Sequence, residues 1–124
     1  ATLAGALFVA IGALGAHFVP SYLERQGLAS DVIAKRVHNL EVGVRYHAYH
    51  ALALLGVSLW MMQVGKPSCS VGVLFMVGLL LFSGFLYVYT FTGIRWTVHV
   101  VPLGGLTLIA GWLVWAFQIF TLRP

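Results

Sequence analysis

The chain has 124 residues, of which 60% are hydrophobic and only 8% are charged. Because a soluble domain carries about 25% charged residues, this composition excludes an ordinary water-soluble protein and indicates a single membrane domain over residues 1–124. The formal net charge of +4 comes from basic residues scattered over the connecting segments, which is typical of anchoring at membrane lipids rather than of nucleic-acid binding.

The first predicted span covers residues 1–19 and ends before Pro20. About 20 helical residues are needed to cross a bilayer core of about 30 Å, so this span is only just long enough. Gly12, Gly15 and Ala16 give it a stripe of small residues, which allows a second helix to pack closely. The chain starts inside an apolar run without Met, so we expect that an N-terminal segment was removed or left out.

The next element is an amphipathic helix over residues 31–43. Apolar residues recur there at spacings of three and four (Ile33, Val37, Leu40 and Val44), and most charged residues fall on the other side. We expect this helix to lie at the membrane interface and to bend or run into the second span.

Three further spans are predicted over residues 45–64, 71–92 and 98–120. A tight turn at Gly65-Lys66-Pro67 separates the first two, and the single cysteine, Cys69, is expected in the same short connection. Short connections place successive helices side by side. The predicted fold class is therefore an all-α membrane protein, a four-transmembrane-helix bundle with an amphipathic interfacial helix between spans 1 and 2.

The basic residues predict the orientation of this bundle. Five of them fall in or beside the first and third connections, and two lie on the side of the termini; the five are Arg25, Lys35, Arg36, Arg45 and Arg95, and the two are Lys66 and Arg123. The positive-inside rule then places the first and third connections on the cytoplasmic or matrix side.

Polar residues of the four spans fall in the half of the membrane next to those two connections. Because unpaired polar groups in hydrocarbon cost several kcal/mol, we expect a polar cluster in the bundle interior. Its members are His17, Tyr46, His50, Ser83 and Tyr87.

Residues for close helix packing and for a kink are also predicted. Glycines that let neighbouring helices approach are expected at Gly84, Gly104, Gly105 and Gly111, in addition to the stripe of the first span. Pro102 is expected to kink the fourth span, because it cannot donate a backbone hydrogen bond and leaves the carbonyl of Val98 free.

Three interpretations of the polar cluster remain open. It is a hydrogen-bond network that fixes the helix register, a haem or metal site ligated by histidines of adjacent helices, or a path for protons or small molecules. No carboxylate lies within any span, and no nucleophile motif, phosphate loop or metal-ligand spacing occurs. We therefore predict no enzyme activity, no metal and no cofactor.

Four blocks of sequence occur in order over about one-third of the chain. They are VAIGALGAH (9–17), GVRYHAYHALALLG (43–56), LFSGFLY (81–87) and PLGGLTLIAGW (102–112). In these blocks the chain resembles a small four-span membrane family, catalogued as domain of unknown function 423. Bacterial inner-membrane proteins and animal transmembrane protein 256 belong to that family, and its animal members are associated with mitochondria.

The resemblance supports the fold and implies a set of family positions. They are Gly12, Gly15, His17, Tyr46, His50, Ser83, Gly84, Tyr87, Pro102, Gly104, Gly105, Gly111 and Trp112. The chain departs from the family at Arg45, where an acidic residue is common, and at His47, where Gln is common. The reversed charge at Arg45 counts against any family proton chemistry that uses the acid. The resemblance implies no reaction, but it implies a bacterial or mitochondrial inner membrane.

The leading functional hypothesis is a non-enzymatic accessory or structural subunit of a larger inner-membrane complex, respiratory complexes included. Its expected partners are membrane lipids and other transmembrane subunits, and not nucleic acid. The alternative is a cofactor-binding or proton- or small-molecule-conducting protein that uses His17 and His50. A bilayer-stabilising protein without fixed partners is a third hypothesis.

Overall fold

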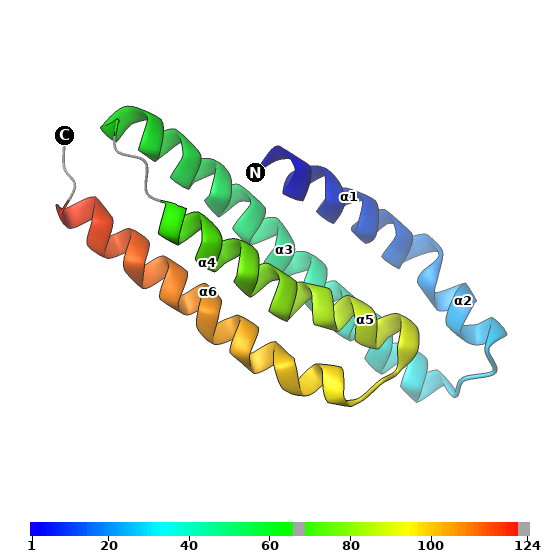
Figure 1. Ribbon diagram of the computed structural model, residues 1–124. Helices are drawn as coiled ribbons and strands as arrows, with labels where there is room; N and C mark the ends of the chain where they lie inside the picture. The colour runs from blue at the N-terminus through cyan, green and yellow to red at the C-terminus, as the bar shows by residue number, and fades with distance from the viewer. Residues whose placement is uncertain (66–68, 122–124) are drawn as a thin grey trace.

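The fold, given by a computed structural model, is built from helices that lie alongside one another (Figure 1). The structure describes residues 1–65 and 69–121. The elements in chain order are α1 (Thr2–His17), α2 (Val19–Arg25), α3 (Ser30–Val64), α4 (Cys69–Leu79), the π-helical turn η1 (Leu80–Gly84), α5 (Phe85–Thr92) and α6 (Trp96–Thr121). Helix α1 packs on α3, α3 packs on α4, η1 and α5, and these three in turn pack on α6.

The predicted amphipathic helix and the second predicted span form one continuous helix, α3, of 35 residues. At about 1.5 Å per residue it is about 50 Å long. The apolar stripe predicted for residues 31–43 is covered by protein rather than by a membrane surface. Ile33, Val37 and Leu40 of this stripe pack in a cluster with Val19 and Leu23 of α2, because the start of α3 lies beside α2 (Figure 1).

A bend separates α1 from α2. The first helix ends at His17, and the chain continues as α2 at an angle of 48° to it. Pro20 stands in the first turn of α2, where its missing N–H costs no hydrogen bond. The predicted end of the first span at residue 19 thus corresponds to a bend rather than to the end of helical structure.

The four predicted membrane spans are confirmed only in part. Two helical segments are long and apolar enough to cross a membrane, Cys69–Thr92 through η1 and Trp96–Thr121, and the bent pair α1 and α2 makes a third if it counts as one span. Helix α3 is long enough, but charged residues in its first half and the tyrosines and histidines at 46–50 lower its hydropathy. The four-span bundle therefore stays a prediction.

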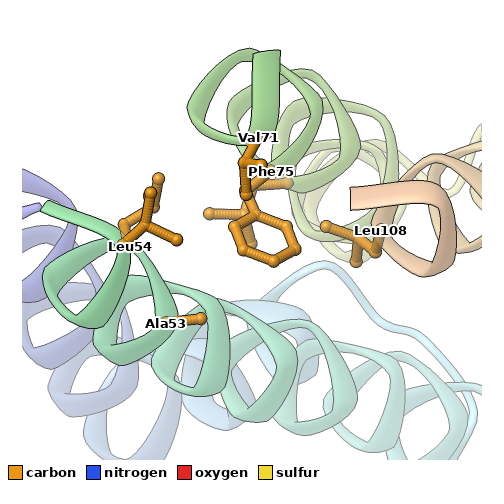
Figure 2. Close-up of a cluster of buried hydrophobic side chains, with 7 residues drawn as sticks. Ala53, Leu54, Val71, Phe75 and Leu108 are labelled. Carbon is orange, nitrogen blue, oxygen red and sulfur yellow. The ribbon is translucent and has the colours of Figure 1, made fainter. Parts of the chain in front are cut away.

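The largest apolar core lies between α3, α4 and α6. Figure 2 shows Phe75 of α4 at its centre, between Leu54 of α3 and Leu108 of α6. Phe75 and Val71 are fully buried. This core fills the half of the bundle that the sequence predicts to be apolar.

Left-handed glycines end two of the long helical segments. Gly65 follows α3 with φ +65° and Gly93 follows α5 with φ +70°, conformations that L side chains rarely adopt. Cys69 is exposed and begins α4, so it lies in a helix and not in the turn. The predicted turn residues Lys66 and Pro67 and the basic residue Arg123 lie outside the described residues.

Candidate functional site

The π-helical turn η1 brings Ser83 against α3. Ser83 is buried, and its hydroxyl donates a hydrogen bond of 2.8 Å to the carbonyl oxygen of Gly43. A Cβ at Gly43 would lie 2.9 Å from Cε1 of Tyr87, closer than real Cβ contacts. Glycine at position 43 thus allows the segment formed by α4, η1 and α5 to approach the backbone of α3. Single π turns such as η1 are frequent at functional sites.

One turn further along α3, His47 meets Tyr87 of α5. The Nδ1 atom of His47 lies 3.1 Å from the Tyr87 hydroxyl. The histidine ring is buried, and the ring of Phe8 on α1 lies 6.3 Å away between centroids. His47 therefore contacts α5 through a hydrogen bond and α1 through an aromatic side chain.

His50 links α3 to α6 and is held as one neutral tautomer. Its Nδ1 lies 2.8 Å from the backbone oxygen of Tyr46, which can only accept, so Nδ1 carries the proton. The indole Nε1–H of Trp112, which can only donate, points at Nε2 over 3.2 Å. Both ring nitrogens are thus satisfied, and the edge-to-face ring of Phe75 lies 5.3 Å away between centroids.

The structure brings together only part of the predicted cluster. Ser83 and Tyr87 face α3 together, and His50 lies on the same side of α3 but bonds to α6. Tyr46 is 40% exposed; its ring lies parallel to that of His50 at 6.3 Å between centroids and is tilted against Phe82 at 4.5 Å, and among the described residues its hydroxyl has no hydrogen-bond partner. His17 is exposed on α1, and among the described residues it forms no hydrogen bond or aromatic contact with the other four.

A further pair of hydrogen bonds ties the start of α3 to the end of α5. The Thr90 hydroxyl donates to the Arg36 carbonyl oxygen at 3.2 Å, and the Arg36 guanidinium donates to the Thr90 carbonyl oxygen at 3.5 Å. The same guanidinium lies directly against Gly93. A cation at this place also stabilises the negative end of α5.

Sequence reasoning missed Arg36, Gly43 and His47 as contact residues, and it did not pair Trp112 with His50. One signal was available: positions 36, 43, 47 and 50 of α3 are spaced by seven, four and three, the spacing of one helix face. The same spacing continues through the apolar residues Leu54, Val57 and Met61. A single seam of α3 therefore meets the other helices, polar in its first half and apolar in its second.

The glycines predicted to allow close packing differ in their surroundings. Gly15, Gly104 and Gly111 are buried, and a Cβ at Gly15 or Gly111 would lie 2.7 Å from Leu40 or Phe75. Gly12 and Gly105 have room for an ordinary contact, at 3.4 Å and 3.7 Å from their nearest neighbours.

Three predicted residues remain: Gly84 and Ala16 for helix packing, and Pro102 for a kink. A Cβ at Gly84 would find only the Leu79 oxygen at 4.0 Å. Ala16 is exposed, and Pro102 lies inside the continuous helix α6. Whether Pro102 kinks that helix stays a prediction.

The hydrogen-bonding groups of Ser83, His47 and His50 are paired within the protein. The lone pair of His50 that could bind an iron atom already accepts the Trp112 N–H. Among residues 1–65 and 69–121 no group of three His, Cys, Asp or Glu side chains is placed to hold a metal ion. The arrangement ties α3 to α5 and α6 through side-chain hydrogen bonds that a bilayer interior would not supply.

Comparison with known proteins gives one family. The family model described as "Protein of unknown function (DUF423)" matches residues 11–105. The UPF0382 inner membrane protein YgdD of Escherichia coli K12 is 33% identical over 113 residues, covering 90% of this chain and 79% of that protein. The UPF0382 membrane protein of Haemophilus influenzae is 31% identical over 118 residues, covering 95% and 88%.

A relative from a Gram-positive bacterium is similar to this chain to about the same degree. The UPF0382 membrane protein YwdK of Bacillus subtilis is 34% identical over 111 residues, covering 87% of this chain and 82% of that protein. No solved structure matches the chain significantly.

Proposed function

The chain belongs to the DUF423 family of membrane proteins, and from this premise we propose that it is a non-enzymatic accessory subunit of a larger inner-membrane assembly, respiratory complexes included. It is an integral membrane protein, and relatives of it are named as inner membrane proteins in bacteria. A mitochondrial location rests on the animal members of the family and stays a prediction.

In this proposal α1, α3, the α4–η1–α5 segment and α6 each cross the membrane. The course of α3 supports this, because it runs beside the two apolar spans over most of its length (Figure 1). Its buried polar residues His47 and His50 bond to the neighbouring helices. Lipid therefore meets the apolar residues of α3, such as Leu52, Leu55 and Leu59, which are exposed.

The observation that carries the proposal is the exposure of α1. Only Ala4 and Gly15 of this 16-residue helix are buried. On the side opposite to α3, small residues recur at spacings of four and three, namely Ala6, Ala10 and Ala13, and all are exposed. Small residues at such spacings let another transmembrane helix approach closely. We therefore assign the partner contact to this side of α1.

The proposal that the chain is not an enzyme rests on the state of its histidines. His50 has both nitrogens occupied, and His47 is paired with Tyr87. General acid–base catalysis by histidine commonly uses a carboxylate that orients the ring and stabilises its charged form. No carboxylate is present in the hydrogen bonds of His47 and His50. The network is thus built for helix packing.

Extraction from the native membrane in mild detergent tests the proposal. We expect the tagged chain to migrate with at least one other membrane polypeptide, and Ala10→Leu to release it because the larger side chain separates the helices. Ala116→Leu, an equal change at an exposed position of α6, is the control and should retain the partner. Migration of the wild-type chain alone or as a homo-oligomer would contradict the proposal.

A further inference from the structure

A groove of about 460 Å³ lies between α1 and the first half of α3. Its α1 side is formed by Gly12, Gly15 and Ala16, and its α3 side includes Val37 and Val44. The volume is within the range of about 300–1,000 Å³ that small-molecule sites occupy. On the α1 side, Gly12 and Ala16 carry no large side chain that would fill this groove.

Two opposite charges line this otherwise apolar groove. Glu41 and Arg45 stand four residues apart on α3, and both line the groove. Both are exposed, and neither side chain forms an ion pair or hydrogen bond with another residue among 1–65 and 69–121. An unpaired carboxylate and guanidinium at the edge of an apolar groove favour a ligand with both an apolar chain and a charged head.

The order of the two charges along α3 determines which charged head group of a ligand fits the groove. Glu41 lies about 6 Å nearer to the start of α3 than Arg45, at about 1.5 Å per residue. The start of α3 is the end that faces the membrane surface in the proposed topology. The cation of Arg45 therefore lies deeper in the membrane, and the anion of Glu41 lies nearer to its surface.

A phosphoethanolamine lipid has the complementary order. Its phosphate lies next to the acyl chains and its ammonium group lies further out. Arg45 can bind the phosphate through paired N–H donors, and the ammonium N–H groups can donate to Glu41. We propose that the groove between α1 and α3 binds the head of a phosphatidylethanolamine molecule, with the phosphate at Arg45, the ammonium group at Glu41 and the acyl chains running past Gly12 toward the membrane centre.

This proposal predicts discrimination between lipids with the same acyl chains. Phosphatidylcholine carries the same charges but has no N–H to donate to Glu41, and phosphatidylglycerol has no cation. A hydrogen bond to a charged group is strong enough for about a tenfold difference in affinity. We expect the chain to retain phosphatidylethanolamine about tenfold better than either of the other lipids.

The test is native mass spectrometry of the whole chain, delipidated and then titrated with each of the three lipids. Arg45→Gln should weaken the binding of all three lipids, because each of them carries a phosphate. Glu41→Gln should bring phosphatidylethanolamine and phosphatidylcholine to equal retention. The exchange Glu41→Arg with Arg45→Glu keeps the net charge and reverses the order, so it should also lose the preference.

A second pair of variants tests the groove without changing charge. Ala16→Leu fills the groove and should reduce bound phosphatidylethanolamine, and Ala13→Leu, exposed on the same helix but outside the groove, should not. Circular dichroism confirms that each variant is folded. Equal retention of the three lipids by the wild-type chain, preference for phosphatidylglycerol, or no retained lipid would each overturn the proposal. The assay uses the isolated chain, so it does not depend on any protein partner.

Discussion

The side chain of His50 has two partners, and each partner has only one possible role in a hydrogen bond. The Tyr46 carbonyl accepts and the Trp112 indole donates, so the imidazole is neutral with its proton on Nδ1. Replacing His50 removes the acceptor and leaves the Trp112 N–H unpaired in an apolar environment. Such an unpaired group costs about 1–3 kcal/mol.

We predict that His50→Leu lowers the free energy of unfolding by about 1–3 kcal/mol. In a double-mutant cycle with Trp112→Phe, the double variant should lose less than the sum of the single variants, with a coupling of about 1 kcal/mol, inside the range measured for interhelical bonds. Reversible unfolding in mixed detergent micelles measures all four proteins. Additive losses would show that the two side chains do not interact.

His17 supplies the control at the residue scale. This histidine is exposed, and within residues 1–65 and 69–121 it forms no hydrogen bond or aromatic contact with the polar cluster. We expect His17→Ala to leave the stability within about 0.5 kcal/mol of the wild-type value, as surface substitutions do. A loss as large as that of His50→Leu would place His17 in the cluster after all.

At the scale of elements, the contact between α6 and η1 depends on one glycine. A Cβ at Gly104 would fall against the backbone nitrogen of Phe82 and lie 2.7 Å from the carbonyl carbon of Leu81. Backbone atoms cannot rotate away as a side chain can. The two segments would have to separate to admit even a methyl group.

We predict that Gly104→Ala destabilises the protein by about 1–3 kcal/mol, the usual cost of overpacking. The matched control is the adjacent Gly105→Ala, whose Cβ would lie 3.7 Å from the Phe82 ring. It should be neutral or should stabilise by up to about 1 kcal/mol through helix propensity. Thermal unfolding in detergent distinguishes the two, and equal effects would contradict the close contact.

The hydrogen bond from η1 to α3 gives a third prediction. We expect Ser83→Ala to cost about 0.6 kcal/mol, the average of interhelical hydrogen bonds in membranes. Ser58→Ala is the control, because the Ser58 hydroxyl donates within its own helix to the Leu54 oxygen. Its removal should have a smaller effect on unfolding in the same micelles.

The sequence predicted the places of the helices better than their contacts. Apolar runs bounded by Gly65 and Gly93 were visible, because left-handed glycines and charged connections interrupt the hydropathy. The sequence left open whether the amphipathic helix bends or runs into the second span, since the charged and apolar halves of α3 look like two elements. The π turn was also hidden, because Leu80–Gly84 has the composition of an ordinary apolar helix.

The same limit applies to the candidate site. Depth along each span can be counted from the sequence, and so Ser83, Tyr87 and His50 were expected at one level. The sequence does not say which face each of the four spans turns toward its neighbours. Tyr46 was therefore placed inside although its ring is 40% exposed, and the pairing of Trp112 with His50 was not foreseen.

At the scale of the whole molecule, the number of membrane spans determines which helix ends lie on the same side of the membrane. If α3 crosses the membrane, the start of α4 and the start of α3 lie on opposite sides. The distribution of basic residues predicts that the start of α3 lies on the cytoplasmic or matrix side. Cys69, the single cysteine, stands exposed at the start of α4 and can report its side directly.

We predict that a membrane-impermeant maleimide labels Cys69 in intact bacterial cells with a permeabilised outer membrane. The variant Cys69→Ser with Ser30→Cys should be labelled only after the inner membrane is opened. A gel shift of the labelled chain measures both. Labelling of both positions from the same side would show that α3 does not cross the membrane.

The π turn makes the chain tolerant of a change in length at one place. A π turn closes its hydrogen bonds over five residues instead of four, so it holds one residue more than the α turn that could replace it. Deleting Leu81 would let the segment close as a regular α turn, which leaves the faces of the following residues in place, so Tyr87 and Thr90 would still point at His47 and Arg36. A deletion in the regular helix beyond the π turn has no such spare residue. Because each residue of an α-helix turns by about 100°, it would rotate every later side chain off its face.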